Sequence, residues 1–343
     1  MKADIPLLLL LIISSALSAG ASEESGIFND SNLSEVSEIS EAYSAPGGQF
    51  QDNRSRDLPD RQSIEFEGCG ELLLPQVKNS GRENVSILSL LPMFLANQSI
   101  TGTALMPDNG SSSAAFLCIS PFSVSDFLSV LEGSGNYSRD NCLDGISGGQ
   151  LSANSSGLAE FRFPPAESGM YAVYIAAPES AGKNESDMGA RPLLVTETDL
   201  ELIMPDRILP DEQFVSIELN TTVADNESKF FAAVMMLESD YRNASLTLSE
   251  NGSSECTDMT LTLSGRSMSI PCPFRLSAGL LFSMLPLLPE NSAVGLQESS
   301  LPGAGLTLMS ENPWKSGRYV VTCCVYSRER GLLGAEQRTV EVI

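Results

Sequence analysis

Short alternating runs of apolar and polar residues fill the chain from about residue 63 onward. Successive side chains of a β-strand point to opposite faces, so a period of two predicts strands with one buried face. Asn, Gly, Asp and Pro separate the runs and predict turns. Ten runs carry the pattern: SITGTALM (99–106), AEFRFP (159–164), MYAVYIAA (170–177), RPLLVTE (191–197), FVSIELN (214–220), FFAAVMML (230–237), ASLTLSE (244–250), MTLTLS (259–264), GRYVVTCCVY (317–326) and RTVEVI (338–343). Many short strands joined by turns are typical of β-sandwiches, so we predict an all-β fold.

One motif occurs twice and indicates two copies of a unit. S-G-M-Y (168–171) and S-G-R-Y (316–319) each open an alternating run. In immunoglobulin-like domains a buried Tyr at this place fixes the corner where the chain enters the penultimate strand. We therefore predict two tandem immunoglobulin-like sandwiches, residues 63–204 and 205–343, with Trp314 in the core of the second.

Each unit is also expected to contain one short helix. C-I-S-P-F-S-V-S (118–125) resembles C-P-F-R-L-S (272–277), and both segments end on a Ser that can cap a helix N-terminus. The apolar segments that follow, residues 126–132 and 278–288, predict helices that cover an open end of each sandwich.

These repeated motifs resemble a family of secreted or surface proteins of methanogenic archaea, whose extracellular repeat domains carry such an S-G-x-Y strand. The resemblance covers both predicted domains. It implies an envelope-associated sandwich protein of unknown function and supplies no catalytic residues.

The first 21 residues have the layout of a signal peptide. Lys2 supplies the positive charge, residues 6–13 the apolar stretch and residues 19–21 an A-x-A cleavage site. The apolar stretch is shorter than the about 20 residues that a membrane-spanning helix needs. We expect an exported chain, extracellular or at the cell surface, without a transmembrane segment. Residues 22–62 are rich in Ser, Glu and Asp and predict a flexible acidic lead-in.

The N-x-[ST] sequon, the acceptor of N-linked glycans, occurs at thirteen of the seventeen Asn residues. Ser and Thr make up roughly a fifth of the chain, so chance placement would give only about three sequons. A glycan is bulky and hydrophilic and has to face solvent. We therefore predict a glycoprotein with sugars at Asn29, Asn32, Asn53, Asn84, Asn97, Asn109, Asn136, Asn154, Asn184, Asn220, Asn226, Asn243 and Asn251.

Seven Cys residues in an exported chain predict disulfide bonds. Two local pairs, Cys118–Cys142 and Cys256–Cys272, close loops of about 15 to 25 residues. Each would contribute roughly 3 kcal/mol to stability in the loop-entropy description. Sequence alone leaves the connectivity open.

The remaining three Cys residues involve one predicted strand. Cys323 and Cys324 are neighbours, so their side chains point to opposite faces of that strand. We expect one of them to form a bridge through the core, with Cys69 as the candidate partner. The other is expected to be free or intermolecular.

Charge and the absence of His exclude several functions. A net charge of −24 opposes binding to nucleic acid or anionic lipid and fits a dispersed extracellular surface. Without His the chain lacks the usual general base of Ser and Cys hydrolases and the commonest transition-metal ligand. G-I-S-G-G (145–149) therefore lacks the partner that a nucleophile elbow needs. S-A-G-K (180–183) lacks the elements that accompany S-x-x-K in hydrolases.

Two His-free chemistries stay open. A pair of carboxylates can hydrolyse a glycoside, although no spacing here singles out a pair. Acid-rich loops at residues 52–60 and 206–212 could bind calcium, although the D-x-[DN]-x-[DN]-G pattern is absent. We otherwise predict no cofactor and no metal site. The acids considered near predicted strands are Glu160, Glu167, Asp240 and Glu311.

These features favour a non-enzymatic envelope protein with a structural, adhesive or assembly role. Its partners would be other envelope proteins or further copies of itself, and no small-molecule substrate is identified. Residues 252–343 contain no sequon, either because core and short loops leave no room or because this surface stays bare for contact. The alternatives are a solute- or glycan-binding module, which needs an aromatic-lined pocket, and a glycosidase.

Overall fold

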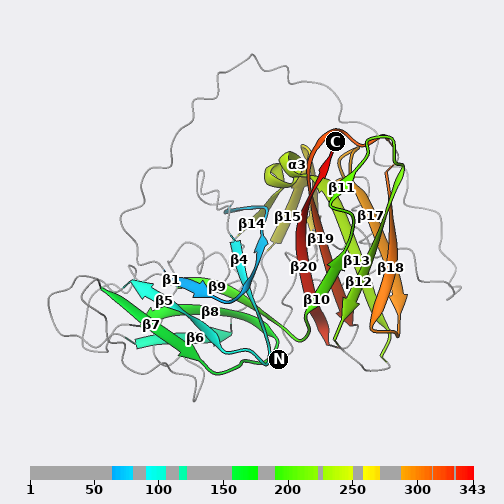
Figure 1. Cartoon of the computed structure of the whole chain (residues 1–343). Coiled ribbons are helices and arrows are strands. Elements are labelled where there is room, and N and C mark those ends of the chain that lie inside the picture. The colour runs from blue at the N-terminus through cyan, green and yellow to red at the C-terminus, as the bar shows by residue number, and fades with distance from the viewer. Residues whose placement is uncertain are drawn as a thin grey trace, which may run out of the picture.

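The computed structural model describes residues 64–79, 90–105, 116–121, 157–176, 190–222, 227–249, 258–270, 287–310, 312–327 and 330–343 (Figure 1). Strands make up most of these residues, and the predicted all-β class is confirmed. The predicted signal peptide, the lead-in and the expected helix at 126–132 lie outside the described residues. Of the second expected helix only Leu287 and Leu288 are described. Among the described helices none is long and apolar enough to span a membrane.

The first sandwich has two layers. One layer contains, in order, β1 (Ile64–Glu67), β5 (Ile100–Leu105) and β7 (Leu158–Phe163). The other contains β2 (Gly70–Leu73), β4 (Leu90–Leu95), β9 (Ala190–Thr196), β8 (Gly169–Ala176) and β6 (Phe116–Pro121). A core that includes Phe94, Ile100 and Phe163 fills the space between them. These are the alternate residues of each strand, as the period of two requires.

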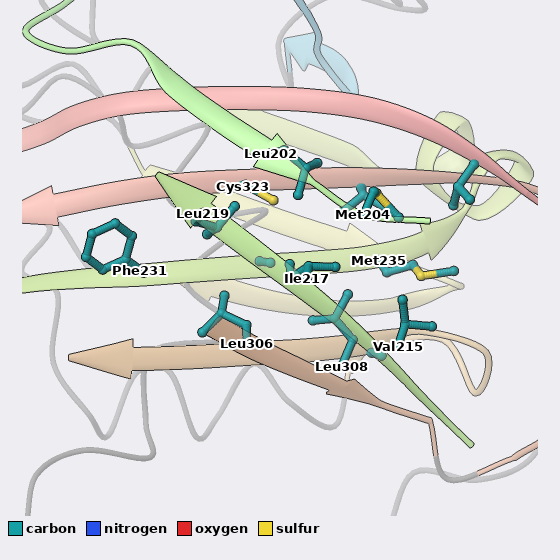
Figure 2. Close-up of a cluster of buried hydrophobic side chains, with 14 of the residues drawn as sticks. Leu202, Met204, Val215, Ile217, Leu219, Phe231, Met235, Leu306, Leu308 and Cys323 are labelled. Atoms are coloured by element: carbon teal, nitrogen blue, oxygen red, sulfur yellow. The ribbon is translucent and has the colours of Figure 1, made fainter. Parts of the chain in front are cut away.

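The second sandwich is one sheet of eight strands folded over on itself. Its outer layer contains β10 (Leu200–Ile203), β12 (Phe214–Thr221) and β18 (Gly303–Met309). Its inner layer contains β17 (Ala293–Ser299), β13 (Lys229–Leu237), β19 (Gly317–Ser327), β20 (Gly331–Val342) and β11 (Arg207–Ile208). Figure 2 shows the core between the layers, where Ile217 and Leu219 of β12 lie near Leu306 and Leu308 of β18.

Both sandwiches share one strand order. The layer β1-β5-β7 corresponds to β10-β12-β18, and the run β6-β8-β9-β4 corresponds to β13-β19-β20-β11. In each run the last strand pairs in parallel with its neighbour, β4 with β9 and β11 with β20. The repeat that the S-G-x-Y motifs indicate therefore has a counterpart in the topology.

A third sheet joins the two sandwiches. It contains β16 (Arg266–Ile270), β15 (Asp258–Leu263), β14 (Ser245–Ser249) and β3 (Gln76–Asn79), and β3 pairs in parallel with β14. Figure 1 shows β14 and β15 between the sandwiches. Helix α3 (Glu238–Asn243), which the sequence patterns did not predict, leads from β13 into this sheet.

The inner layer of the second sandwich is therefore covered on both faces. Phe231 and Met235 of β13 lie in the core of that sandwich, whereas Phe230 and Val234 lie in a separate core shared with Leu72 and Leu194 of the first sandwich. A strand buried on both faces needs a continuous apolar run, which explains the sequence FFAAVMML.

The expected division at residues 204 and 205 separates strands that belong together. β10 lies before it but pairs with β12, which lies after it. β3 likewise lies in the first unit but pairs with β14 of the second. Each sandwich has its own core, and the shared core makes the two units neighbours over a buried junction.

Candidate interaction surface

The outward face of β10, β12 and β18 carries three exposed large apolar side chains, Ile203, Phe214 and Met309. In β12 the residues Val215, Ile217 and Leu219 point inward and are buried. Phe214 belongs to the alternate, outward set and is 60% exposed. It lies directly opposite Met309 of β18, which is 68% exposed. Exposed apolar side chains that lie together mark sites of interaction.

A groove of about 730 Å³ crosses the other end of this face. Residues that line it include Ile203, Met204, Asn220, Leu301, Pro302 and Gly305. Gly303 and Gly305 of β18 both line the groove, and the space beside Gly305 is open. A Cβ atom built on Gly305 would meet no atom within 4 Å.

Asn220 forms the wall of the groove beside Gly303. The two residues are opposite each other in the β12–β18 ladder. A Cβ atom on Gly303 would lie 2.5 Å from Oδ1 of Asn220 and 3.0 Å from the carbonyl oxygen of Leu219. Glycine therefore leaves the space that the Asn220 amide occupies.

Three of the thirteen sequon Asn residues lie in the described part of the chain. Asn97 is exposed in the turn after β4, Asn243 is exposed at the end of α3, and Asn220 is half-buried. None of the three is buried, as attachment of a glycan requires. Their occupancy stays a prediction. The other ten, Asn29, Asn32, Asn53, Asn84, Asn109, Asn136, Asn154, Asn184, Asn226 and Asn251, lie outside the described residues.

The repeated Tyr residues are structural. Tyr171 Oη donates a hydrogen bond of 2.9 Å to the carbonyl oxygen of Glu167, four residues upstream. Tyr319 Oη accepts one of 3.2 Å from the backbone N–H of Lys315, again four residues upstream. Trp314 is buried with its ring edge-on to Tyr319, 5.6 Å between centroids. Both corners and the core position of Trp314 agree with the sequence interpretation.

The cysteines differ from expectation at one place. Cys69, Cys323 and Cys324 are free thiols, so the expected bridge from Cys69 to this strand is not formed. Cys69 packs against the core of the first sandwich, whereas Cys323 lies in the core of the second. Cys324 faces the shared core instead, so the two neighbours do point to opposite faces.

Burial also determines the chemistry of these thiols. Cys323 and Cys324 are both 0% exposed, which excludes an intermolecular bridge in the folded chain. Burial raises the pKa of both, so they stay protonated. Cys118 is buried and disulfide-bonded. Its predicted partner Cys142 lies outside the described residues, as do Cys256 and Cys272, so these pairings stay predictions.

Three of the four candidate acids lie in the described part of the chain. Glu160 and Glu167 are exposed and Asp240 lies half-exposed on α3, while Glu311 lies outside the described residues. No group of three or more His, Cys, Asp or Glu residues that could hold a metal ion occurs in the described ranges. The acid-rich loop at 52–60 and the motifs at 145–149 and 180–183 lie outside these ranges.

A second, polar hollow of about 580 Å³ lies between β10 and β20. Asp199, Glu201, Glu336 and Arg338 line it together with β10. Burial, with a smaller contribution from the charge of Asp199, raises the pKa of Glu336. Arg338 also forms an ion pair of 3.6 Å with Asp206, in the other acid-rich loop considered for calcium.

Comparisons with known proteins show likeness in solved structures only. No family model matches the chain, and no curated protein matches it. A transglutaminase of red sea bream is similar with a TM-score of 0.27 and 9% identity, over 73% of this chain and 30% of its own. The adhesin InvE of Yersinia pseudotuberculosis is similar with a TM-score of 0.21 and 10% identity, over 73% of this chain and 56% of its own.

A third likeness is to the fibronectin(III)-like modules of CbhA from Clostridium thermocellum. Here the TM-score is 0.19 and the identity 11%, over 82% of this chain and 94% of that chain. These TM-scores are low, and we infer no function from the three proteins. The chain spans less than two thirds of the length of the transglutaminase and of the adhesin.

Proposed function

We propose that this chain is a non-enzymatic glycoprotein of the cell surface with a structural, adhesive or assembly role. The observation that carries the proposal is the exposed pair Phe214 and Met309 on the outer layer of the second sandwich. Its contacts would be with other envelope proteins or with further copies of this chain.

The chemistry of the pair fits a protein contact. Aromatic and Met side chains are enriched in the centre of protein interfaces, where they bury apolar area. Leu209, which is 53% exposed, is a further apolar side chain in the turn that leads into β12. The strands beneath these side chains pack on a buried core, so the surface is rigid and little ordering entropy opposes association.

The groove fits a solute- or glycan-binding module less well. Its lining among the described residues contains no aromatic side chain on which a sugar ring or planar ligand could stack. It contains one carboxylate, Glu218, whereas glycoside hydrolysis needs two.

The test removes the apolar pair and leaves the fold in place. Phe214→Ser with Met309→Ser should weaken association by roughly 30-fold, the loss typical of a removed anchor at the centre of an interface. Sedimentation of the secreted chain over a concentration series, and co-isolation from native envelope, would measure it. Leu158→Ser is the matched control, because Leu158 is 38% exposed on β7 of the first sandwich.

Equal association of the double variant and the wild-type chain would refute the assignment of this surface. Loss of association in the Leu158→Ser control as well would show that the effect is not specific to the outer layer.

A further inference from the structure

We propose that the glycan on Asn220 lies in the groove of the outer layer. The inference rests on the proposed glycosylation of the chain and goes beyond it, because it names one sugar and the surface that this sugar covers. The face of β10, β12 and β18 is then divided into a carbohydrate-covered half and a bare apolar half.

The sequon is held at the wall of the groove. Asn220 points outward on β12, and its amide oxygen occupies the space that the missing side chain of Gly303 leaves. The next residue, Thr221, donates its backbone N–H to the carbonyl oxygen of Pro302 at 2.7 Å. The hydroxyl of Thr222, the third sequon residue, lies 2.8 Å from the hydroxyl of Thr198. These contacts hold the attachment point in one position, so a sugar on Asn220 starts at the groove.

The groove offers a floor that suits a sugar ring. Leu301 is 66% exposed and Ile203 is 46% exposed, while Gly305 presents backbone and open space. The C–H face of a pyranose ring is apolar and can cover these groups, while its hydroxyls remain in water.

The covalent link makes the glycan the occupant. Without a stacked aromatic, a free sugar should bind this floor only weakly. A glycan tethered at Asn220 is present at an effective concentration in the mM range, so even weak affinity fills the groove. A free solute or a segment of another protein would first have to displace it.

The pairing of β12 with β18 explains why the outward face of the outer layer has two different halves. The pair Asn220–Gly303 and the pair Phe214–Met309 lie at opposite ends of β12 and β18, about 20 Å apart at roughly 3.3 Å per residue. A glycan in the groove therefore covers the end near the junction with the first sandwich. Phe214 and Met309 remain bare, and contacts of this face are directed to them.

The experiment uses the full chain secreted from a host that glycosylates N-x-[ST] sequons. Mass spectrometry of glycopeptides determines occupancy at Asn220. Hydroxyl-radical footprinting then compares Asn220→Gln with the control Asn243→Gln, which removes an exposed glycan at the end of α3. We expect labelling of Leu301 to rise at least threefold in Asn220→Gln and to stay unchanged in the control, with Met309 unchanged in both.

A second variant tests the position of the sugar without removing it. Gly305→Gln places a polar side chain in open space of the groove. The NMR signals of the sugar attached to Asn220 should shift toward those of the sugar at Asn243. Unchanged signals would show that the sugar already lies outside the groove.

The outcomes separate this inference from the proposed function. An unmodified Asn220 beside other occupied sequons, or equal labelling of Leu301 with and without its glycan, overturns the inference alone. A secreted chain with no occupied sequon overturns the proposed glycoprotein as well.

Discussion

Tyr241 joins the two sandwiches through a buried polar network. It lies on α3, is 1% exposed, and its hydroxyl donates to the carbonyl oxygen of Leu73. Gln337 Nε2 donates to this hydroxyl at 3.2 Å and to Thr322 Oγ1 at 2.9 Å. Burial strongly raises the pKa of Tyr241, so the hydroxyl keeps the proton that it donates.

Tyr241→Phe removes the donor and leaves the ring in place. The Leu73 carbonyl keeps a longer bond of 3.3 Å from Gln337 Nε2, so it is not left wholly unsatisfied. We expect the free energy of unfolding to fall by about 1 to 2 kcal/mol, the cost of one buried hydrogen bond that the bond from Gln337 partly replaces. Tyr241→Ala also removes the ring from the shared core and should cost roughly 3 to 5 kcal/mol.

Urea unfolding followed by two probes measures both effects. Trp314, the only Trp, reports the second sandwich by fluorescence, and far-ultraviolet circular dichroism reports both. The two curves should coincide for the wild-type chain and for Tyr241→Phe, and should separate for Tyr241→Ala. Tyr319→Phe is the control, since its hydroxyl bond lies within the second sandwich. A Tyr241→Phe loss below about 0.5 kcal/mol, or coincident curves for Tyr241→Ala, would refute the coupling.

Two further predictions concern glycine and pH. Gly305→Val should stabilise the fold by up to about 1 kcal/mol, since it adds a β-branched residue to a strand where a Cβ meets nothing. Gly102→Ala should lower the free energy of unfolding by more than about 2 kcal/mol, because the added Cβ would lie 2.1 Å from the carbonyl oxygen of Glu65. Urea unfolding of both glycine variants measures these changes. Burial raises the pKa of Glu336 above its ordinary value of 4.5, so the folded chain binds this proton more tightly than the unfolded chain does. The resulting stabilisation is present below the pKa of the unfolded chain and is lost as pH rises through the pKa of the folded chain. Glu336→Gln should therefore gain stability relative to wild type between about pH 4 and about pH 7 in urea unfolding, and an equal difference at both pH values would contradict this.

The sequence indicates most strongly those strands that bury an alternating set of residues. All ten alternating runs lie in strands, and nine agree with their strand to within one residue at each end, whereas β20 begins at Gly331, seven residues before its run at 338–343. β17 and β18 were not predicted, because glycines interrupt their apolar pattern. Packing favours glycine at Gly295 of β17, since a Cβ there would lie 2.9 Å from a terminal side-chain carbon of Leu308 and 3.2 Å from Cβ of Leu306. A contact between residues of different strands leaves no pattern in the local sequence from which the strand could be predicted.

The apolar pair on the outer layer could have been found from the register of one run. In FVSIELN the buried residues Val215, Ile217 and Leu219 occupy one parity. Phe214 falls in the other parity, together with Ser216 and Glu218, and so had to face outward. Its partner Met309 could not be identified in this way, because the pairing of β12 with β18 joins segments far apart in the chain. The groove likewise depends on that pairing, which brings Asn220 beside Gly303.

The junction between the sandwiches gives the exposed pair a rigid support. Beyond the shared core, Arg330 forms ion pairs with Glu197 after β9 and, at 2.7 Å, with Glu227 before β13. These groups come from both sandwiches and meet near the end of the second sandwich that carries Asn220. Bending at this junction would expose the shared core and break the network around Tyr241, so the two sandwiches should move as one body. A rigid body, a sugar at one end of the outer layer and bare apolar side chains at the other together restrict where a partner can bind. The proposed role in surface assembly therefore depends on the junction as much as on the contact residues.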